Sequence, residues 1–296
     1  MTELMSPVLP RGTAAEKPFD VVVTPETAGW GYCGLRILDL PVGARATFPT
    51  GDDEMLVLPL AGGCDVTCDD ERVTLTGRAS VFSRVSDFAY VPRDATVTVR
   101  APGGGRFALP TARADRRLPF RYGAAEDVAV ELRGAGQASR QVNNFCTPAT
   151  FGCDRLIACE ILTPGGNWSS YPPHKHDEVR DGESVLEEIY YFEVAASPSG
   201  SPGTAFQRVY GHADRPIDVC TEVRSGDVVL VPYGWHGPSM AAPGYDLYYL
   251  NVMAGPGERV WLIRDDPAHG WVRETWADQK LDPRLPLTSA VERRHS

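Results

Sequence analysis

Residues 171–176 read Tyr-Pro-Pro-His-Lys-His, and with two later segments they are the strongest indication of the fold. Glu188 lies beside a strand-like run, and residues 232–236 read Pro-Tyr-Gly-Trp-His. Three histidines and a carboxylate next to strand-like runs fit one divalent metal ion on a β scaffold. The first 173 residues contain no histidine, so an imidazole-based metal site must lie in the second half of the chain.

The spacing of the histidines predicts which side chains face the metal. Alternate side chains of a β-strand share a face, so His174 and His176 point the same way and Lys175 points the opposite way. Residues 226–232 form a Gly-x5-Pro segment that would place His236 at the end of a further strand. Neutral imidazoles and a carboxylate suit Zn²⁺, Mn²⁺, Fe²⁺ or Ni²⁺, with open positions left for substrate oxygens.

The rest of the chain predicts many short strands. It has 296 residues, enough for two ordinary domains, and its 29 glycines and 25 prolines favour frequent turns. Runs rich in Val, Leu and Phe indicate sandwich or barrel architecture. They lie at 20–24, 35–40, 55–60, 72–75, 79–82, 88–91, 96–99, 156–162, 189–194, 206–210, 217–223, 227–231, 245–253 and 258–263. Residues 270–280 fit a short helix.

Two similar units are expected, one before and one after a segment rich in Arg, Gly and Ala at residues 112–143. The separation of Glu54 from Pro92 is 38 residues, and that of Glu188 from Pro232 is 44, which indicates a weak internal repeat. We therefore predict an N-terminal domain over residues 1–135 and a C-terminal metal-binding domain over residues 136–296. The N-terminal unit would be a structural or interface module without metal ligands.

Charge and cysteine content limit the partners and the compartment. The formal net charge of −10 argues against a broad basic surface for nucleic acid. Seven cysteines, an odd number in a chain of this size, favour reduced thiols over a disulfide framework. Residues 1–17 have no apolar core of signal-peptide length, and no apolar run approaches the roughly 18 residues that span a membrane. We expect a cytoplasmic protein that binds neither nucleic acid nor membrane.

The metal-ligand pattern resembles a known superfamily. His-x-His, then Glu, then Gly-x5-Pro-x-Gly and His resembles the two sequence motifs of the cupins. More specifically, the second half resembles the 5-deoxy-glucuronate isomerase family of myo-inositol catabolism. The segments that carry this resemblance are 168–177 (WSSYPPHKHD), 186–192 (LEEIYYF), 207–210 (QRVY), 226–232 (GDVVLVP) and 245–256 (YDLYYLNVMAGP). It is dense from about residue 146 to 272 and looser in the first half, where residues 50–54 (TGDDE) are most recognisable.

One departure from the cupin pattern leaves the acidic ligand open. Eleven residues separate His176 from Glu188, where the usual gap is three or four. Glu183, Glu187 and Glu188 therefore compete for the position. We favour Glu188 because the next four residues, Ile-Tyr-Tyr-Phe, resemble the strand that follows the cupin carboxylate. In addition, one residue instead of two separates Gly234 from His236, and a methionine replaces the asparagine often found after the last histidine.

The resemblance implies a fold, a cofactor and a reaction. The fold is all-β, with two tandem cupin-type double-stranded β-helix barrels (a bicupin), and such proteins often form homo-oligomers. One divalent ion per chain is expected on His174, His176, Glu188 and His236. The related 4-deoxyuronate isomerases make zinc the first expectation, with Mn²⁺ or Fe²⁺ as alternatives. The reaction is an aldose–ketose isomerisation of a small sugar acid, converting 5-deoxy-D-glucuronate to 5-dehydro-2-deoxy-D-gluconate. Its hydrogen could move as a proton through an enediol or as a hydride.

Other functions and further site residues follow from the same residues. The alternatives are another metal-dependent sugar-acid isomerase, a cupin dioxygenase and a non-enzymatic sugar-binding cupin. A guanidinium matches a carboxylate bidentately, so Arg208 is the first candidate to bind the acid group, ahead of Arg155 and Lys175. Tyr210 shares a strand face with Arg208 and would accompany it. Tyr190 shares a face with Glu188 and is the candidate, with Arg208, for a catalytic role.

Overall fold

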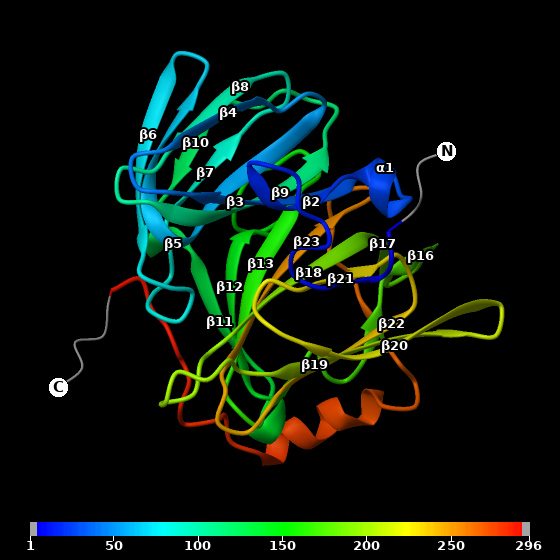
Figure 1. The fold of residues 1–296 in the computed structure, drawn as a ribbon. Coiled ribbons are helices and arrows are strands. Elements are labelled where there is room, and N and C mark those ends of the chain that lie inside the picture. Colours follow the sequence, from blue (N-terminus) through cyan, green and yellow to red (C-terminus); the bar gives the residue numbers. More distant parts are fainter. Residues whose placement is uncertain (1–4, 292–296) are drawn as a thin grey trace.

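The computed structural model describes residues 5–291, and nearly all its regular structure is β-strand (Figure 1). Two barrel-like units lie against each other, one drawn blue to cyan and the other green to orange (Figure 1). This confirms the predicted all-β class and is consistent with the expected pair of barrels. Among the described residues, no helix is both long and apolar enough for a membrane span.

The first unit is one nine-stranded sheet curled on itself. Its central path runs β10-β7-β5-β9-β3-β2, and β4, β6 and β8 pair off this path. The strands are β2 (Phe19–Val23), β3 (Cys33–Leu40), β4 (Arg45–Pro49), β5 (Asp53–Cys68), β6 (Glu71–Arg78), β7 (Phe88–Val91), β8 (Thr96–Arg100), β9 (Gly105–Arg113) and β10 (Arg121–Gly123), with the short helix α1 (Pro25–Ala28) after β2.

The second unit has two main sheets. The seven-stranded sheet holds β1 (Val8–Leu9), β21 (Val228–Val231), β18 (Glu187–Val194), β23 (Leu247–Ala254), β13 (Ile157–Thr163), β12 (Arg140–Cys146) and β11 (Ala129–Arg133). The six-stranded sheet holds β20 (Arg215–Val223), β19 (Ala205–His212), β22 (Trp235–Ala241), β15 (His174–Lys175), β24 (Arg264–Asp265) and β14 (Trp168–Ser169). The remaining elements are the hairpin of β16 (Asp177–Arg180) and β17 (Glu183–Val185), and the 3₁₀ helices η1 (Ala125–Asp127), η2 (Gly136–Ala138) and η3 (Gly270–Asp278).

Three apolar cores explain why the central strands are apolar on both faces. One core fills the first barrel, one fills the second, and the largest lies between the two sheets. Alternation in β18 sends Ile189 and Tyr191 into the core between the barrels. The residues between them in sequence, Tyr190 and Phe192, point into the second barrel. Strands buried on both faces read as continuous apolar runs, which is how β18 and β23 appear in the sequence.

Two carboxylates clamp the barrels together reciprocally. Glu54 of β5 is fully buried and accepts hydrogen bonds from the backbone N–H groups of residues 154–156, at 2.6 to 2.8 Å. Glu187 of β18 accepts three from the backbone of residues 31–33, at 2.6 to 2.9 Å. Each barrel thus holds a loop of the other by the same device. In the internal repeat, Glu54 therefore has the same structural role in the first unit as Glu187 has in the second.

Strand pairing also links the units across the expected boundary. The boundary predicted near residue 135 falls just after β11, which pairs with β12 in the second barrel's sheet. From the other end of the chain, β1 pairs with β21 and so also joins the second barrel. The division at residue 135 stays a prediction, but strand pairing assigns residues from Ala129 onward, together with β1, to the second unit.

Most strand predictions match the structure, and two are wrong. Residues 79–82 form a turn, in which Ser83 N donates to Ser80 O at 3.1 Å and Ser80 N donates to Ser83 Oγ at 3.1 Å. Serine hydroxyls compete in this way with sheet hydrogen bonds. Residues 258–263 form no strand and are tied to Ser184 through Leu262 instead. The short helix expected at residues 270–280 is confirmed as η3.

Candidate metal centre and its cavity

Three of the four predicted metal ligands converge inside the second barrel. One ligand atom each from His176, Glu188 and His236 lie within 4.8 Å of one another, and all three side chains are buried. Glu188 comes from β18 and His236 from β22, on different sheets of the barrel, while His176 directly follows β15. The barrel thus brings together residues 60 positions apart in sequence.

His174, the fourth predicted ligand, lies beside this group but outside its 4.8 Å limit. Its ring centroid is 4.5 Å from that of His236 and 6.4 Å from that of His176. The pairing of β15 with β22 sets this position, because His174 lies directly opposite His236 in the register. His174 also lines a small internal cavity together with Glu188.

Backbone carbonyls orient two of the imidazole rings. His176 Nδ1 lies 3.0 Å from Leu186 O, and His236 Nδ1 lies 3.1 Å from Gly234 O. A carbonyl only accepts, so each Nδ1 carries the proton and each Nε2 presents a lone pair. Both Nε2 atoms face Glu188 Oε2, at 3.1 and 3.0 Å. This is the arrangement in which a histidine serves as a metal ligand.

The hydrogen bonding within the site indicates that its side chains suit a metal ion. His236 Nε2 is buried, and no group of the described residues forms a hydrogen bond of acceptable geometry with it. The distance from His236 Nε2 to Glu188 Oε2 is 3.0 Å, which is within ion-pair range, but the two atoms do not form a hydrogen bond of acceptable geometry. A buried polar atom without a partner is costly, and a cation between the imidazoles and the carboxylate would satisfy it. Two imidazoles and a carboxylate, with a third imidazole adjacent, suit a first-row divalent ion.

The electrostatics of the group keep the carboxylate charged. Burial raises the pKa of Glu188, but the electrostatic influence of His236, followed by that of His176, outweighs it and lowers this pKa to about 2. Burial acts to lower the pKa of His176, yet Glu188 raises it above its usual value. Burial, followed by the neighbouring His236, lowers the pKa of His174 well below its usual value. The group therefore offers a negative oxygen and, at His174, a neutral imidazole.

The two competing carboxylates have other partners. Glu187 binds the backbone of the first barrel, as described above. Glu183 accepts hydrogen bonds from Lys175 Nζ at 2.8 Å and from Arg180 Nε at 2.6 Å. Of the three, Glu188 is the one grouped with the imidazoles.

Asn251 is a site residue that the sequence analysis missed. Its Nδ2 donates a hydrogen bond to Glu188 Oε1, the oxygen that does not face the histidines. It lies on β23 directly opposite Tyr190 of β18. Among the eight buried residues of that strand, Asn251 is the one with an amide or charged side chain. A single amide in an otherwise apolar and aromatic run is the feature by which the sequence could have identified it.

We expect Asn251→Leu to weaken metal binding about 10- to 100-fold, because partners that orient a ligand contribute on this scale. The substitution keeps the side-chain size and removes the hydrogen bond that holds the Glu188 carboxylate. Competition with a chelator of known affinity measures the change. Asn144→Leu, on the same sheet but away from the site, is the control. Equal metal affinity in Asn251→Leu and the unsubstituted protein would remove Asn251 from the site.

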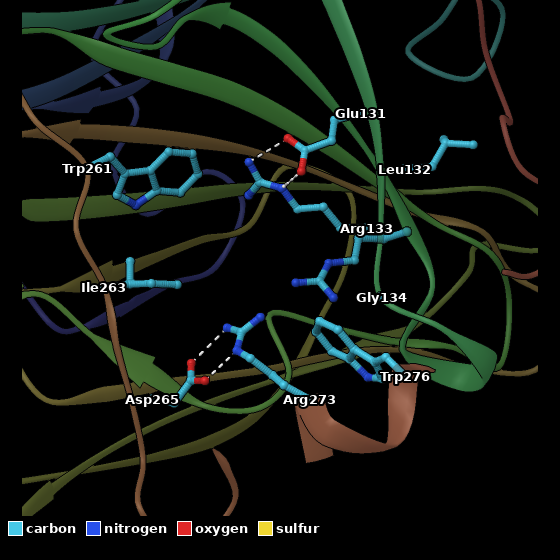
Figure 2. A pocket seen from close by; sticks show the side chains of 10 residues that line it. Glu131, Leu132, Arg133, Gly134, Trp261, Ile263, Asp265, Arg273 and Trp276 are labelled. Atoms are coloured by element: carbon cyan, nitrogen blue, oxygen red, sulfur yellow. Dashed lines mark hydrogen bonds and ion pairs between the residues drawn. The ribbon is translucent and has the colours of Figure 1, made fainter. Parts of the chain in front are cut away.

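Two adjoining hollows lie on this side of the candidate ligands. The inner one, of about 40 Å³, is lined by His174, Glu188, Tyr190 and Asn251 among others. The outer one, of about 610 Å³, shares Trp261, Ile263 and three arginines with it. Figure 2 shows the outer hollow, with Trp261 and Ile263 on one side and Trp276 on another. Tyr190 is buried, and its hydroxyl lies 3.4 Å from Ser170 Oγ. Burial raises the pKa of Tyr190 well above its usual value.

Arg208 and Tyr210 lie elsewhere. They share a face of β19, as predicted, but it is the outer face: the residues between and before them, Val209 and Gln207, are the buried ones. Arg208 pairs with Asp218, and the Tyr210 hydroxyl donates to Asp266. Both line a separate surface hollow of about 340 Å³.

Arg155 and Lys175 are engaged in structural contacts. Arg155 Nη1 donates to Gly255 O at 3.0 Å, and its Nη2 pairs with Asp115 of the first unit. Lys175 Nζ lies 2.8 Å from Glu183 Oε1. It sits opposite the two histidines, as the alternation predicted. Neither residue lines the inner or the outer hollow, and these placements give no support to a role in substrate binding.

Comparisons with known proteins agree on one relationship. The model of the KduI/IolB family matches residues 8–272. A 5-deoxy-glucuronate isomerase of Geobacillus kaustophilus is 41% identical over 273 residues, which are 90% of this chain and 95% of that protein. The structure of an IolB-like protein from Salmonella typhimurium is 34% identical and covers 90% of this chain and 98% of that one, with a TM-score of 0.82.

A more distant structural neighbour supports the fold alone. Oxalate decarboxylase of Lactobacillus farciminis superposes with a TM-score of 0.60, covering 89% of this chain and 90% of that one. Its sequence is 13% identical. At that identity, the similarity is one of fold and carries nothing about the reaction.

Proposed function

Since this chain belongs to the KduI/IolB family, we propose that it is a metal-dependent isomerase that converts 5-deoxy-D-glucuronate to 5-dehydro-2-deoxy-D-gluconate. The observation that carries the proposal is the convergence of His176, Glu188 and His236, of which Glu188 lines the inner hollow together with His174. We place the enzyme in the cytoplasm, where it would work as a homo-oligomer on a small sugar acid.

The ligand set in this proposal has four members. His176, Glu188 and His236 hold the ion, and His174, whose ring is next to that of His236, completes the set. Zinc is the first choice, with Mn²⁺ or Fe²⁺ as alternatives. When bound, the ion would supply Lewis-acid polarisation of the substrate carbonyl. Asn251 and the carbonyls of Leu186 and Gly234 hold three of these ligands in orientation.

The reaction moves one hydrogen between adjacent carbons and one proton from the hydroxyl oxygen to the aldehyde oxygen, so that all atoms and electrons are conserved. The carbon next to the aldehyde loses hydrogen and its hydroxyl becomes a ketone, while the aldehyde carbon gains hydrogen and becomes an alcohol. The product is numbered from the acid end, so the ketone lies at C5. For Tyr190, which lines the inner hollow together with Glu188, we propose that the hydroxyl donates a hydrogen bond to a substrate oxygen. The buried walls of that hollow exclude bulk water from the transfer.

A single assay tests this function. Purified protein is treated with a chelator, dialysed, and assayed on 5-deoxy-D-glucuronate before and after single metals are added back. We expect the chelated protein to lose at least about 1,000-fold in kcat/KM, since metal polarisation contributes several kcal/mol, and one added metal to restore activity. Full activity in protein of verified zero metal content would contradict the proposal. Oxygen uptake would indicate a dioxygenase, and thermal stabilisation without turnover a sugar-binding protein.

A further inference from the structure

Three arginines lie where the outer and inner hollows adjoin. Arg133, Arg140 and Arg273 line both of them. Arg133 and Arg140 lie opposite each other on the paired strands β11 and β12, and Arg273 comes from the distant helix η3. Figure 2 labels Arg133 and Arg273, which extend toward the hollow from opposite sides of it. An arginine cluster at the entrance of a metal cavity points to an anionic ligand.

Two of the three arginines are already paired. Arg133 forms a bidentate pair with Glu131, with Nε and Nη2 at 2.7 and 2.8 Å from the two carboxylate oxygens. Arg273 pairs in the same way with Asp265, through Nε and through Nη2 at 2.7 Å (Figure 2). Each guanidinium uses one edge for its carboxylate. These pairs fix the planes of the two groups in the wall of the hollow.

Arg140 has no such partner. It is 8% exposed, and its Nη1 donates to the backbone oxygen of Ala138 at 3.0 Å. Within residues 5–291, no carboxylate lies at ion-pair distance from it. Three guanidinium groups and two carboxylates thus leave one positive charge unmatched. Burial, reinforced by Arg133 and Arg273, lowers the pKa of Arg140 to about 10, which reflects the cost of keeping this charge without a counter-ion.

The backbone around Arg140 is shaped to hold it there. Gly134, between β11 and η2, has a φ of +79°, and an added Cβ would lie 2.1 Å from Ala138 O and 2.9 Å from Arg140 Nη1. A side chain at this position would therefore displace the guanidinium. The Trp276 ring lies against Arg140 at 5.6 Å and closes its other side.

We infer that Arg140, flanked by Arg133 and Arg273, is the binding site for the carboxylate of the substrate, in the place that Arg208 was expected to fill. The inference rests on the proposed function for the identity of the acid. One unmatched positive charge suits one carboxylate, which a guanidinium binds bidentately. The same arginines border the hollow of His174 and Glu188, so the rest of the sugar extends from the carboxylate toward the metal ligands.

A buried charge without a counter-ion lowers the stability of the protein. The effect of removing Arg140 on stability therefore distinguishes a ligand-binding role from a structural one. If Arg140 only supported the fold, its replacement by methionine would lower the melting temperature. If the charge of Arg140 is matched only by a bound ligand, Arg140→Met leaves the Tm of the ligand-free protein unchanged or raises it, while binding of the acid is lost.

Calorimetric titration of the metal-loaded protein tests the inference without turnover. The probes are D-gluconate, a six-carbon sugar acid that has no aldehyde to isomerise, and sorbitol, which has a hydroxymethyl group in place of the carboxylate. We expect the unsubstituted protein to bind gluconate about 10- to 100-fold more tightly than sorbitol, and Arg140→Met to lose that preference. Arg224→Met, a change at an exposed arginine of the same barrel, should keep it.

The outcomes distinguish this inference from the proposed function. An active isomerase in which Arg140→Met keeps both gluconate affinity and KM overturns the inference alone, and the same holds if Arg208→Met instead loses the preference. A protein that prefers gluconate through Arg140 but does not isomerise 5-deoxy-D-glucuronate supports the inference and removes the function. If Arg140→Met does not fold, Arg140→Lys decides: gluconate affinity equal to that of the unsubstituted protein would contradict bidentate binding.

Discussion

His236→Ala is expected to abolish metal binding and activity together while the protein keeps its fold. The imidazole Nε2 faces Glu188 and has no hydrogen-bond partner of good geometry in the described chain, so its loss removes a ligand and few native contacts. We expect metal content to fall from about one ion per chain to below about a tenth. We expect kcat/KM to fall at least about 1,000-fold. Elemental analysis and the isomerase assay measure the two effects.

The control for this change is a histidine outside the site. His212→Ala alters an exposed residue at the end of β19 and should leave metal content and kcat/KM unchanged. Circular dichroism on metal-free samples checks that both variants are folded. A full complement of metal in His236→Ala would refute the assigned ligand set.

Arg78→Met is expected to cost about 3–5 kcal/mol in the free energy of unfolding, the range for breaking a buried ion pair. Arg78 of the first barrel donates to Glu160 of the second through Nη1 at 2.9 Å and Nη2 at 2.7 Å, and both side chains are fully buried. Without Arg78, Glu160 stays in the interface as a buried negative charge with no cationic partner among the described residues, although Asn143 still donates to it. Urea unfolding followed by circular dichroism measures the loss.

Two further variants separate charge from packing at this interface. Arg72→Met removes an exposed guanidinium from Asp65, which keeps Arg100 and Thr74 as partners, and should cost about 0–1 kcal/mol. The double change Arg78→Met and Glu160→Leu removes both charges and should recover much of the stability lost in Arg78→Met. A loss below about 1 kcal/mol in Arg78→Met would mean that water or rearrangement solvates Glu160.

Short-range patterns predicted the strands well where burial was one-sided or complete. The runs that became β3, β7, β13 and β18 lie within a residue or two of their observed bounds. The pattern failed at β22, where a glycine and a proline interrupt a segment that nonetheless pairs with β14, β15 and β19. Tertiary pairing outweighed local preference there, as it does when neighbours on both sides supply hydrogen bonds.

The histidines of the candidate metal site could be identified from the sequence because histidines are few in this chain, whereas the sequence could not choose among the neighbouring carboxylates. Glu183, Glu187 and Glu188 lie within six residues, and the structure gives each a different partner. Strand alternation separates Glu187 from Glu188, but it does not say which face is the barrel interior. That depends on the sheet's packing, which sends one carboxylate to the first barrel and its neighbour to the imidazoles.

The sequence alone determined the class of fold, the half of the chain that holds the metal site, and which side chains share a strand face, because these depend on composition and on a period of two residues. The tertiary structure decided which face looks inward and which arginines reach the cavity. Arg208 and Tyr210 share a face as predicted, yet packing of Val209 and Gln207 into the barrel turns that face outward. Arg133 and Arg140 are neighbours in the pairing of β11 with β12, and only the return of η3 brings Arg273, more than 130 residues away in sequence, to the same hollow.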